Sequence, residues 1–145
     1  MLAPALLLPA AGDALPARAA ATVQVNDTGH LHRTSGRGIT INQVLNEAGS
    51  ASGTIPGSIY IHLRVVSVNR VTAEVNIYPH GGFVGGEASA GFRSSGATAT
   101  FNGTLTVTRG SGRYSHAHAS GLSFTGTIAR ASDAILVHVN GRLFT

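Results

Sequence analysis

The sequence predicts an all-β fold, and within that class a single closed antiparallel β-barrel of about eight strands. Hydrophobic and polar residues alternate at period two along several stretches, which is typical of strands with one buried face. The 19 glycines mark turns between these stretches. Only 11% of the 145 residues are charged while 43% are hydrophobic, a composition that favours one folded domain.

Residues 1–21 are predicted to be a secretory signal peptide. An apolar stretch that starts at Leu2 is followed by small residues, which suits cleavage after Ala19 or Ala21. A disordered N-terminal tail is the alternative, because no basic residue precedes the apolar stretch. The stretch is too short to span a bilayer. We therefore expect residues 22–145 to form a barrel domain without a transmembrane segment, secreted to an extracellular or periplasmic location.

The first third of this domain has a weak pattern. We expect a first strand near residues 22–25 and then a loop. Residues 38–46 suit a strand or, from Asn42 on, a short helical turn, and the Ser/Gly/Pro-rich residues 49–57 suit a loop.

Residues 58–78 predict a β-hairpin, because apolar residues take every second position on both sides of a short connection. A three-residue loop at 68–70 places Leu63 opposite Val75. The same register sets Arg64 opposite Glu74, the only predicted pair of opposite charges on the sheet. Such a pair more often stabilises strand pairing than it performs catalysis.

The remaining strands follow at regular spacing. Gly81-Gly82 and Gly85-Gly86 bracket a weaker strand and predict bulges or tight bends. Residues 97–108 alternate clearly, and their motif Phe101-Asn-Gly-Thr-Leu105 is echoed by Phe124-Thr-Gly-Thr-Ile128, which indicates equivalent positions in successive hairpins. With a last strand at 135–143, closure into a barrel would remove the exposed sheet edges.

The segment 109–121 carries the most distinctive polar residues. Gly110-Ser-Gly-Arg-Tyr114, followed by Ala117 and Gly121, resembles the hairpin shared by dirigent proteins and allene oxide cyclases. This resemblance implies an eight-stranded, frequently trimeric barrel. Its interior would hold an apolar or phenolic small molecule and steer a cyclisation or coupling without a cofactor.

The residues that match this motif are mostly architectural, with Gly110 and Gly112 as structural turn glycines. Where dirigent proteins place a pocket arginine, this chain has His118. The pocket carboxylates of those proteins have no counterpart that we can place by motif. The activity therefore does not follow from the fold, and whether the protein is an enzyme at all stays open between a cyclase or isomerase and no catalysis.

Tyr114, His116 and His118 are the candidate catalytic residues. Their spacing of two places them on one side of a strand, so they form either a polar row inside the barrel or part of the surface. Inside, the imidazoles could transfer protons near neutral pH. The candidate ligand-binding residues are Arg113, Arg64, Glu74, Phe101 and Phe124.

Several classes of function are disfavoured. The chain has no cysteine, which excludes a disulfide framework, a thiol nucleophile and a thiolate metal site. The pairs His30/His32 and His116/His118 lack a neighbouring carboxylate, so we expect no metal and no other cofactor. All 10 basic residues are arginines and they are scattered, which disfavours nucleic acid as a partner.

Two hypotheses about function remain. In the first, the protein is a secreted barrel that binds an apolar or phenolic molecule inside and forms a trimer or dimer. It requires a cavity lined by aromatic side chains. In the second, the protein is a non-catalytic extracellular module that acts by self-association. It requires a filled interior and an apolar outer patch.

Overall fold

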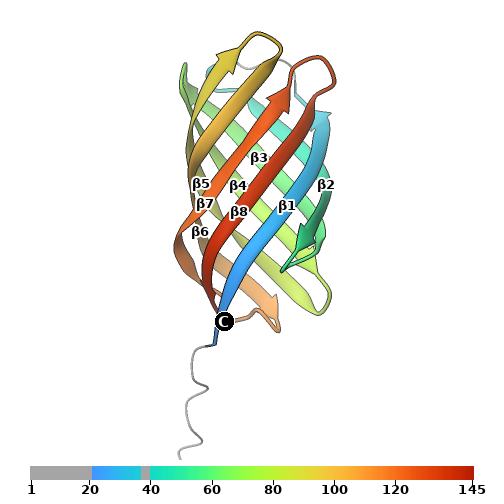
Figure 1. Cartoon of the computed structure of the whole chain (residues 1–145), viewed down its shortest axis with the longest axis vertical. Helices are drawn as coiled ribbons and strands as arrows, with labels where there is room; N and C mark the ends of the chain where they lie inside the picture. Colours follow the sequence, from blue (N-terminus) through green and yellow to red (C-terminus); the bar gives the residue numbers. More distant parts are fainter. Residues whose placement is uncertain (1–20, 37–39) are drawn as a thin grey trace, which may run out of the picture.

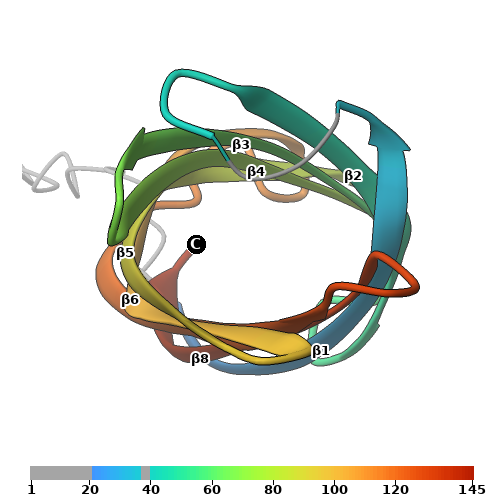
Figure 2. The ribbon, with the colours of Figure 1, turned by 90° about the horizontal axis from the view of Figure 1, so that it is seen from above.

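The computed structural model describes residues 21–36 and 40–145, which form one closed antiparallel barrel (Figure 1). The strands are β1 (Thr22–Ser35), β2 (Val44–Gly53), β3 (Gly57–Ser67), β4 (Arg70–Pro79), β5 (Gly82–Ser95), β6 (Thr98–Gly112), β7 (Ala119–Ala129) and β8 (Ala134–Phe144). Each strand pairs with the next along the chain, and β8 pairs with β1 to close the ring seen in Figure 2. The predicted closed all-β barrel is confirmed.

The interior is filled by aliphatic side chains. Along β3, Ile59, Ile61, Leu63 and Val65 are buried, while the residues between them are exposed. All the strands contribute to the same core. A barrel of eight strands encloses only enough space for its own side chains or for one small ligand. Alternation at period two thus sets which residues face the core.

The first two strands are longer than the sequence predicts. β1 runs to Ser35 instead of ending near residue 25, and β2 continues to Gly53 through the segment predicted as a loop. The inward positions there include Gly29 and Gly49. At Gly49 a Cβ atom would overlap the backbone of His30 on the neighbouring strand. Small inward residues allow this close approach and also remove the apolar alternation by which a strand is recognised.

The predicted hairpin is present with a different register. Leu63 lies opposite Ala73 and Ile61 opposite Val75, a shift of two residues from the predicted pairing. A shift of two leaves every side chain on the predicted face. The turn contains only Val68 and Asn69, and an irregularity in the pairing between Val65 and Ser67 absorbs the remaining residue. The predicted cross-strand partner of Arg64 is therefore wrong: Arg64 faces Thr72.

Bulges bend the sheet into a ring. The pairing of β5 with β6 shifts between Gly85 and Gly86, which confirms the bulge predicted there. Gly81 has φ +83° in the turn between β4 and β5, a backbone conformation that favours glycine.

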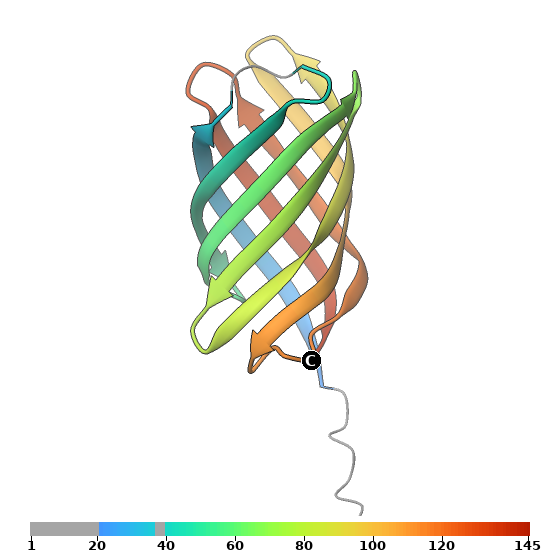
Figure 3. The same ribbon diagram turned by 180° about the vertical axis from the view of Figure 1, so that it is seen from behind.

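The turns between the strands lie at the two ends of the barrel. We call the end with the β1–β2, β3–β4, β5–β6 and β7–β8 turns the upper end, and the opposite end the lower end (Figures 1 and 3).

The lower end is partly covered by its own connections. Ile55, between β2 and β3, and Ala117, between β6 and β7, are both buried against the core. The C-terminus lies at this end, where the amide of Thr145 donates to the carbonyl oxygen of Ala21 at 2.8 Å.

Residues 1–20 of the predicted signal peptide lie outside the described residues. In the part of the chain that the structure describes, no helix is long and apolar enough to cross a membrane.

Candidate functional site

The candidate row Tyr114, His116 and His118 does not lie along a strand face. β6 ends at Gly112, and residues 113–116 form a turn before β7 begins. The amide of Tyr114 donates to the carbonyl oxygen of Ser111 at 3.0 Å. The prediction of a shared strand face is therefore wrong, because the chain turns at residues 113–116 instead of continuing as an extended strand. Gly110 and Gly112, predicted as turn glycines, are the last part of β6 beside this turn.

The two histidines of this connection are exposed at the lower end of the barrel. The His118 ring stacks on Phe144 with a centroid distance of 5.3 Å, and its Nδ1 donates to the carbonyl oxygen of His116 at 3.0 Å. Tyr114 is half-buried against the core, and the Arg113 guanidinium lies 5.5 Å from the centre of its ring. These contacts attach the connection to the end of the barrel.

Phe101 and Phe124 belong to the packed interior. Both side chains are buried, and their ring centroids are 5.3 Å apart. A small enclosed apolar pocket beside Phe101 and Phe92 measures about 10 Å³, no more than a single water molecule needs. The two phenylalanines are therefore part of the packed core, and a ligand at this position would have to displace them.

The interior also contains two carboxylates, which the sequence pattern does not predict there. Asp27 on β1 and Glu47 on β2 are both buried. Their positions follow the period-two alternation, Asp27 with Val25 and Glu47 with Leu45. That alternation is the signal that could have located them, but the sequence predicts a loop after residue 25 and no strand from residue 47 to residue 57.

Glu47 forms the centre of a charged group near the upper end. Its Oε1 lies 3.6 Å from Nε of Arg33, and Nη2 of Arg33 lies 3.6 Å from Oδ1 of Asp133. Burial raises the pKa of Glu47 to about 7; Arg33 opposes this shift and Asp133 adds to it. Such a pKa suits a proton-transfer group. The Glu47 side chain is only 1% exposed, however, so a substrate cannot reach it in this conformation.

Asp27 has a structural role at the opposite end. Its Oδ1 accepts a hydrogen bond from the amide of Ile55 at 2.8 Å. Burial raises the pKa of Asp27, and hydrogen bonds from the backbone of Ile55 and Thr54 oppose that shift. The carboxylate thus holds the β2–β3 connection in the position that buries Ile55.

Glu74, the predicted partner of Arg64, is paired with another arginine. Nη2 of Arg109 lies 3.5 Å from Oε1 of Glu74, and its Nη1 lies 3.4 Å from Oε1 of Glu87. Nη2 also donates to Oδ1 of Asn76 at 3.2 Å. Among the described residues, Arg64 has no carboxylate at ion-pairing distance.

β3 and β4 lie on the side of the barrel that faces the viewer in Figure 3. On their outer surface and that of β5 is a cluster of aromatic side chains. The Tyr60 and Tyr78 rings meet edge to face at 5.7 Å, and Phe83 lies 5.1 Å from Tyr78. Tyr60 and Tyr78 remain 44% and 49% exposed. We call this surface the tyrosine face and define it by Ser58, Tyr60, His62, Asn76, Tyr78 and Phe83.

Two shallow depressions follow the tyrosine face. One, of about 450 Å³, is lined by Ser58, Tyr60, His62, Asn76 and Tyr78. The other, of about 210 Å³, shares His62 and reaches Arg64, Glu74 and Glu87. Exposed aromatic rings beside groups of both charges are typical of binding surfaces, since tyrosine offers a large apolar area and a hydroxyl group.

Comparison with protein-family models, with curated proteins and with solved structures finds no match to this chain. The fold thus defines the class, a closed eight-stranded antiparallel barrel, and the function of such a barrel is set by the residues of its surface and interior.

Proposed function

We propose that this protein is a non-catalytic barrel module that acts by self-association through the tyrosine face. The observation that carries the proposal is the contrast between an interior filled by side chains and an outer face with exposed, contacting tyrosines. The interior ligand of the alternative hypothesis would need a cavity of several hundred Å³. The enclosed apolar pocket beside Phe92 and Phe101, inside the core, measures only about 10 Å³.

A second copy of this chain is the partner that the charges of the face favour. Arg64 lacks a carboxylate partner among the described residues, while the Glu87 side chain is 60% exposed. A two-fold axis brings each patch against itself, so a patch with both charges is complementary to its own copy. The tyrosines would supply the apolar centre of such a contact.

Secretion and the resemblance to allene oxide cyclases and dirigent proteins remain part of the proposal. The eight-stranded barrel is compatible with the resemblance but is shared by many unrelated proteins. An extracellular location suits a module that assembles by its outer surface, and it rests on the predicted signal peptide.

Native mass spectrometry of the protein, purified without denaturation, tests assembly and ligand binding in one measurement. We expect a dimer whose mass equals two chains. The double variant Tyr60→Ser/Tyr78→Ser should be monomeric, because it removes the apolar centre of the contact. The control Val68→Ser changes an exposed apolar residue on the β3–β4 turn, at the opposite end of β3 from Tyr60, and should remain dimeric.

A monomer that carries the additional mass of one small organic molecule would overturn this proposal and favour the interior-ligand hypothesis. A dimer that persists in the double variant would show that another surface mediates assembly.

A further inference from the structure

A second surface, on the other side of the barrel, has a different chemistry. A depression of about 950 Å³ lies on the outside of β5 to β8, beside the β3–β4 turn. Its polar lining includes Arg93, Thr100, Asn102, Thr125, Thr127 and His138. These residues alternate with buried ones on their strands, so the depression belongs to the outer surface. We call it the threonine groove.

The neutral part of the groove is a regular set of hydroxyl and amide groups. Along β6 every outward residue from Thr98 to Thr108 is a threonine or an asparagine. The neighbouring positions on β7 are Thr125 and Thr127. Hydroxyl and amide groups both donate and accept hydrogen bonds, which matches the hydroxyl groups of a sugar.

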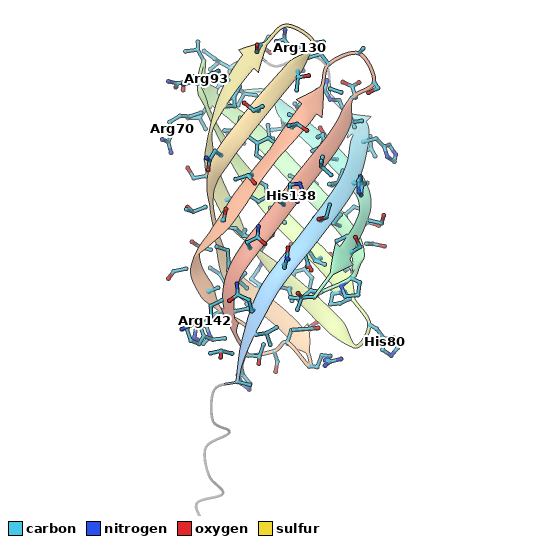
Figure 4. All side chains as sticks on the ribbon, viewed as in Figure 1. Arg70, His80, Arg93, Arg130, His138 and Arg142 are labelled. Carbon is cyan, nitrogen blue, oxygen red and sulfur yellow. The ribbon has the colours of Figure 1, made fainter. Side chains whose placement is uncertain are left out.

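The groove is flanked by positive charge. Arg93 lines it, Arg70 pairs in register with Gly91 of its lining, and Nη2 of Arg130 donates to Oγ of Ser94, also in the lining, at 3.3 Å. Figure 4 shows the three arginines near the upper end of the barrel. Within the described part of the chain, no carboxylate pairs with any of them.

We propose that the threonine groove binds an acidic polysaccharide, a chain of sugar units that carry carboxylate or sulfate groups. The guanidinium group binds such anions through two parallel hydrogen bonds. The threonines and Asn102 would bind the hydroxyl groups of the sugar rings. The volume is at the upper end of the range for sites that take small ligands, so a short segment of chain fits.

Nucleic acid suits the groove less well. Proteins that bind single strands stack the bases on exposed aromatic rings. In the groove, Phe101 is buried and Phe92 is half-buried against the core. The exposed tyrosines lie on the tyrosine face, which is a separate surface.

Isothermal titration of the whole protein with a hexasaccharide of galacturonic acid tests this site. We expect binding that is at least about tenfold tighter than that of maltohexaose, which has the same length and no charge. Arg93→Gln should weaken the affinity by about fivefold, the loss expected for one charge-assisted contact. Thr125→Val/Thr127→Val keeps the side-chain shape and should weaken it by about threefold.

Arg142→Gln is the matched control, because Arg142 is exposed and lies at the lower end of the barrel (Figure 4). An equal loss of affinity in Arg142→Gln and Arg93→Gln would overturn the proposal, since it would reduce binding to net charge. So would a hexasaccharide that does not bind. Tighter binding of a single-stranded oligonucleotide, insensitive to the threonine changes, would reassign the groove to nucleic acid. Circular dichroism verifies that each variant keeps the barrel.

Discussion

Glu47 couples the protonation of one buried residue to the stability of the barrel. Its pKa is about 7 in the folded protein and close to 4.5 in an unfolded chain. Between these values the folded state binds a proton that the unfolded state has released, so the free energy of unfolding falls as pH rises. The contribution is fully present below pH 4.5 and is lost by about pH 7. Its size is about 3 kcal/mol at most.

Urea unfolding at several pH values between 5 and 8 measures this effect. In Glu47→Gln the side chain no longer titrates, so the decrease in unfolding free energy over this range should be smaller than in the unchanged protein. Glu87→Gln removes an exposed carboxylate and should leave the pH dependence as it is. Equal slopes in the unchanged protein and in Glu47→Gln would show that Glu47 is ionised in the folded state at pH 5.

For the β3–β4 hairpin, the sequence predicts which residues share a strand face, but it does not predict which charged residues pair with each other. The sequence predicts that Arg64 and Glu74 share the polar face of one hairpin, and the structure places both on the outside of the barrel. It could not show that Arg109 is the partner of Glu74, because that contact crosses β5 and depends on the bulge at Gly85. Nor could it place Glu47 beside Arg33, since the sequence predicts that the first strand ends near residue 25, before Arg33.

At the scale of strands, β6 and β7 are matched by a reciprocal arrangement of phenylalanine and glycine. Phe101 lies opposite Gly126, and Phe124 lies opposite Gly103. The repeated motif noted in the sequence thus forms one antiparallel pair, in which each ring faces the glycine of the other strand. A Cβ atom at Gly126 would overlap the Phe101 ring and the carbonyl oxygen of Leu136.

Gly126→Ala should therefore destabilise the barrel by about 2 kcal/mol, the usual effect of overfilling a packed core. Gly91→Ala is the matched control, because a Cβ atom there would come no closer than 3.7 Å to its neighbours. Thermal unfolding followed by circular dichroism measures both. Equal melting temperatures for Gly126→Ala and the unchanged protein would mean that the rings move aside without cost.

The strands could be predicted where large apolar residues alternate and could not where the inward residues are small. β3, β4 and the end of β6 were located because Ile, Leu and Val mark their inward positions. The sequence predicts a loop from residue 49 on, where β2 in fact continues, because its inward positions there are Gly49 and Ala51. Register depends on turn length and on bulges, and a turn with one residue fewer together with the irregularity between Val65 and Ser67 moved the β3–β4 pairing by two positions.

At the scale of the whole molecule, the decisive contact is the pairing of β1 with β8. It joins the first and the last strand of the described barrel through a ladder of paired residues, from Thr22 opposite Phe144 to His32 opposite Ala134. Asn26 and Asn140 lie opposite each other in this ladder, and both are exposed. The chain has no cysteine of its own, so a pair introduced here can form only the intended bond within one chain.

Asn26→Cys/Asn140→Cys should form a disulfide within one chain under mild oxidation, because the cross-strand neighbours of an antiparallel pair are close enough for the bond. The bond closes a loop on the order of 100 residues, so it should raise the unfolding free energy by about 4 kcal/mol. Thiol labelling with mass spectrometry detects the bond, and urea unfolding with and without reductant measures its effect. Asn26→Cys/Thr104→Cys, whose second residue lies on β6, should stay reduced. If Asn26→Cys/Asn140→Cys also stays reduced, the barrel is open between β1 and β8, and both the filled interior and the two outer surfaces would have to be reconsidered.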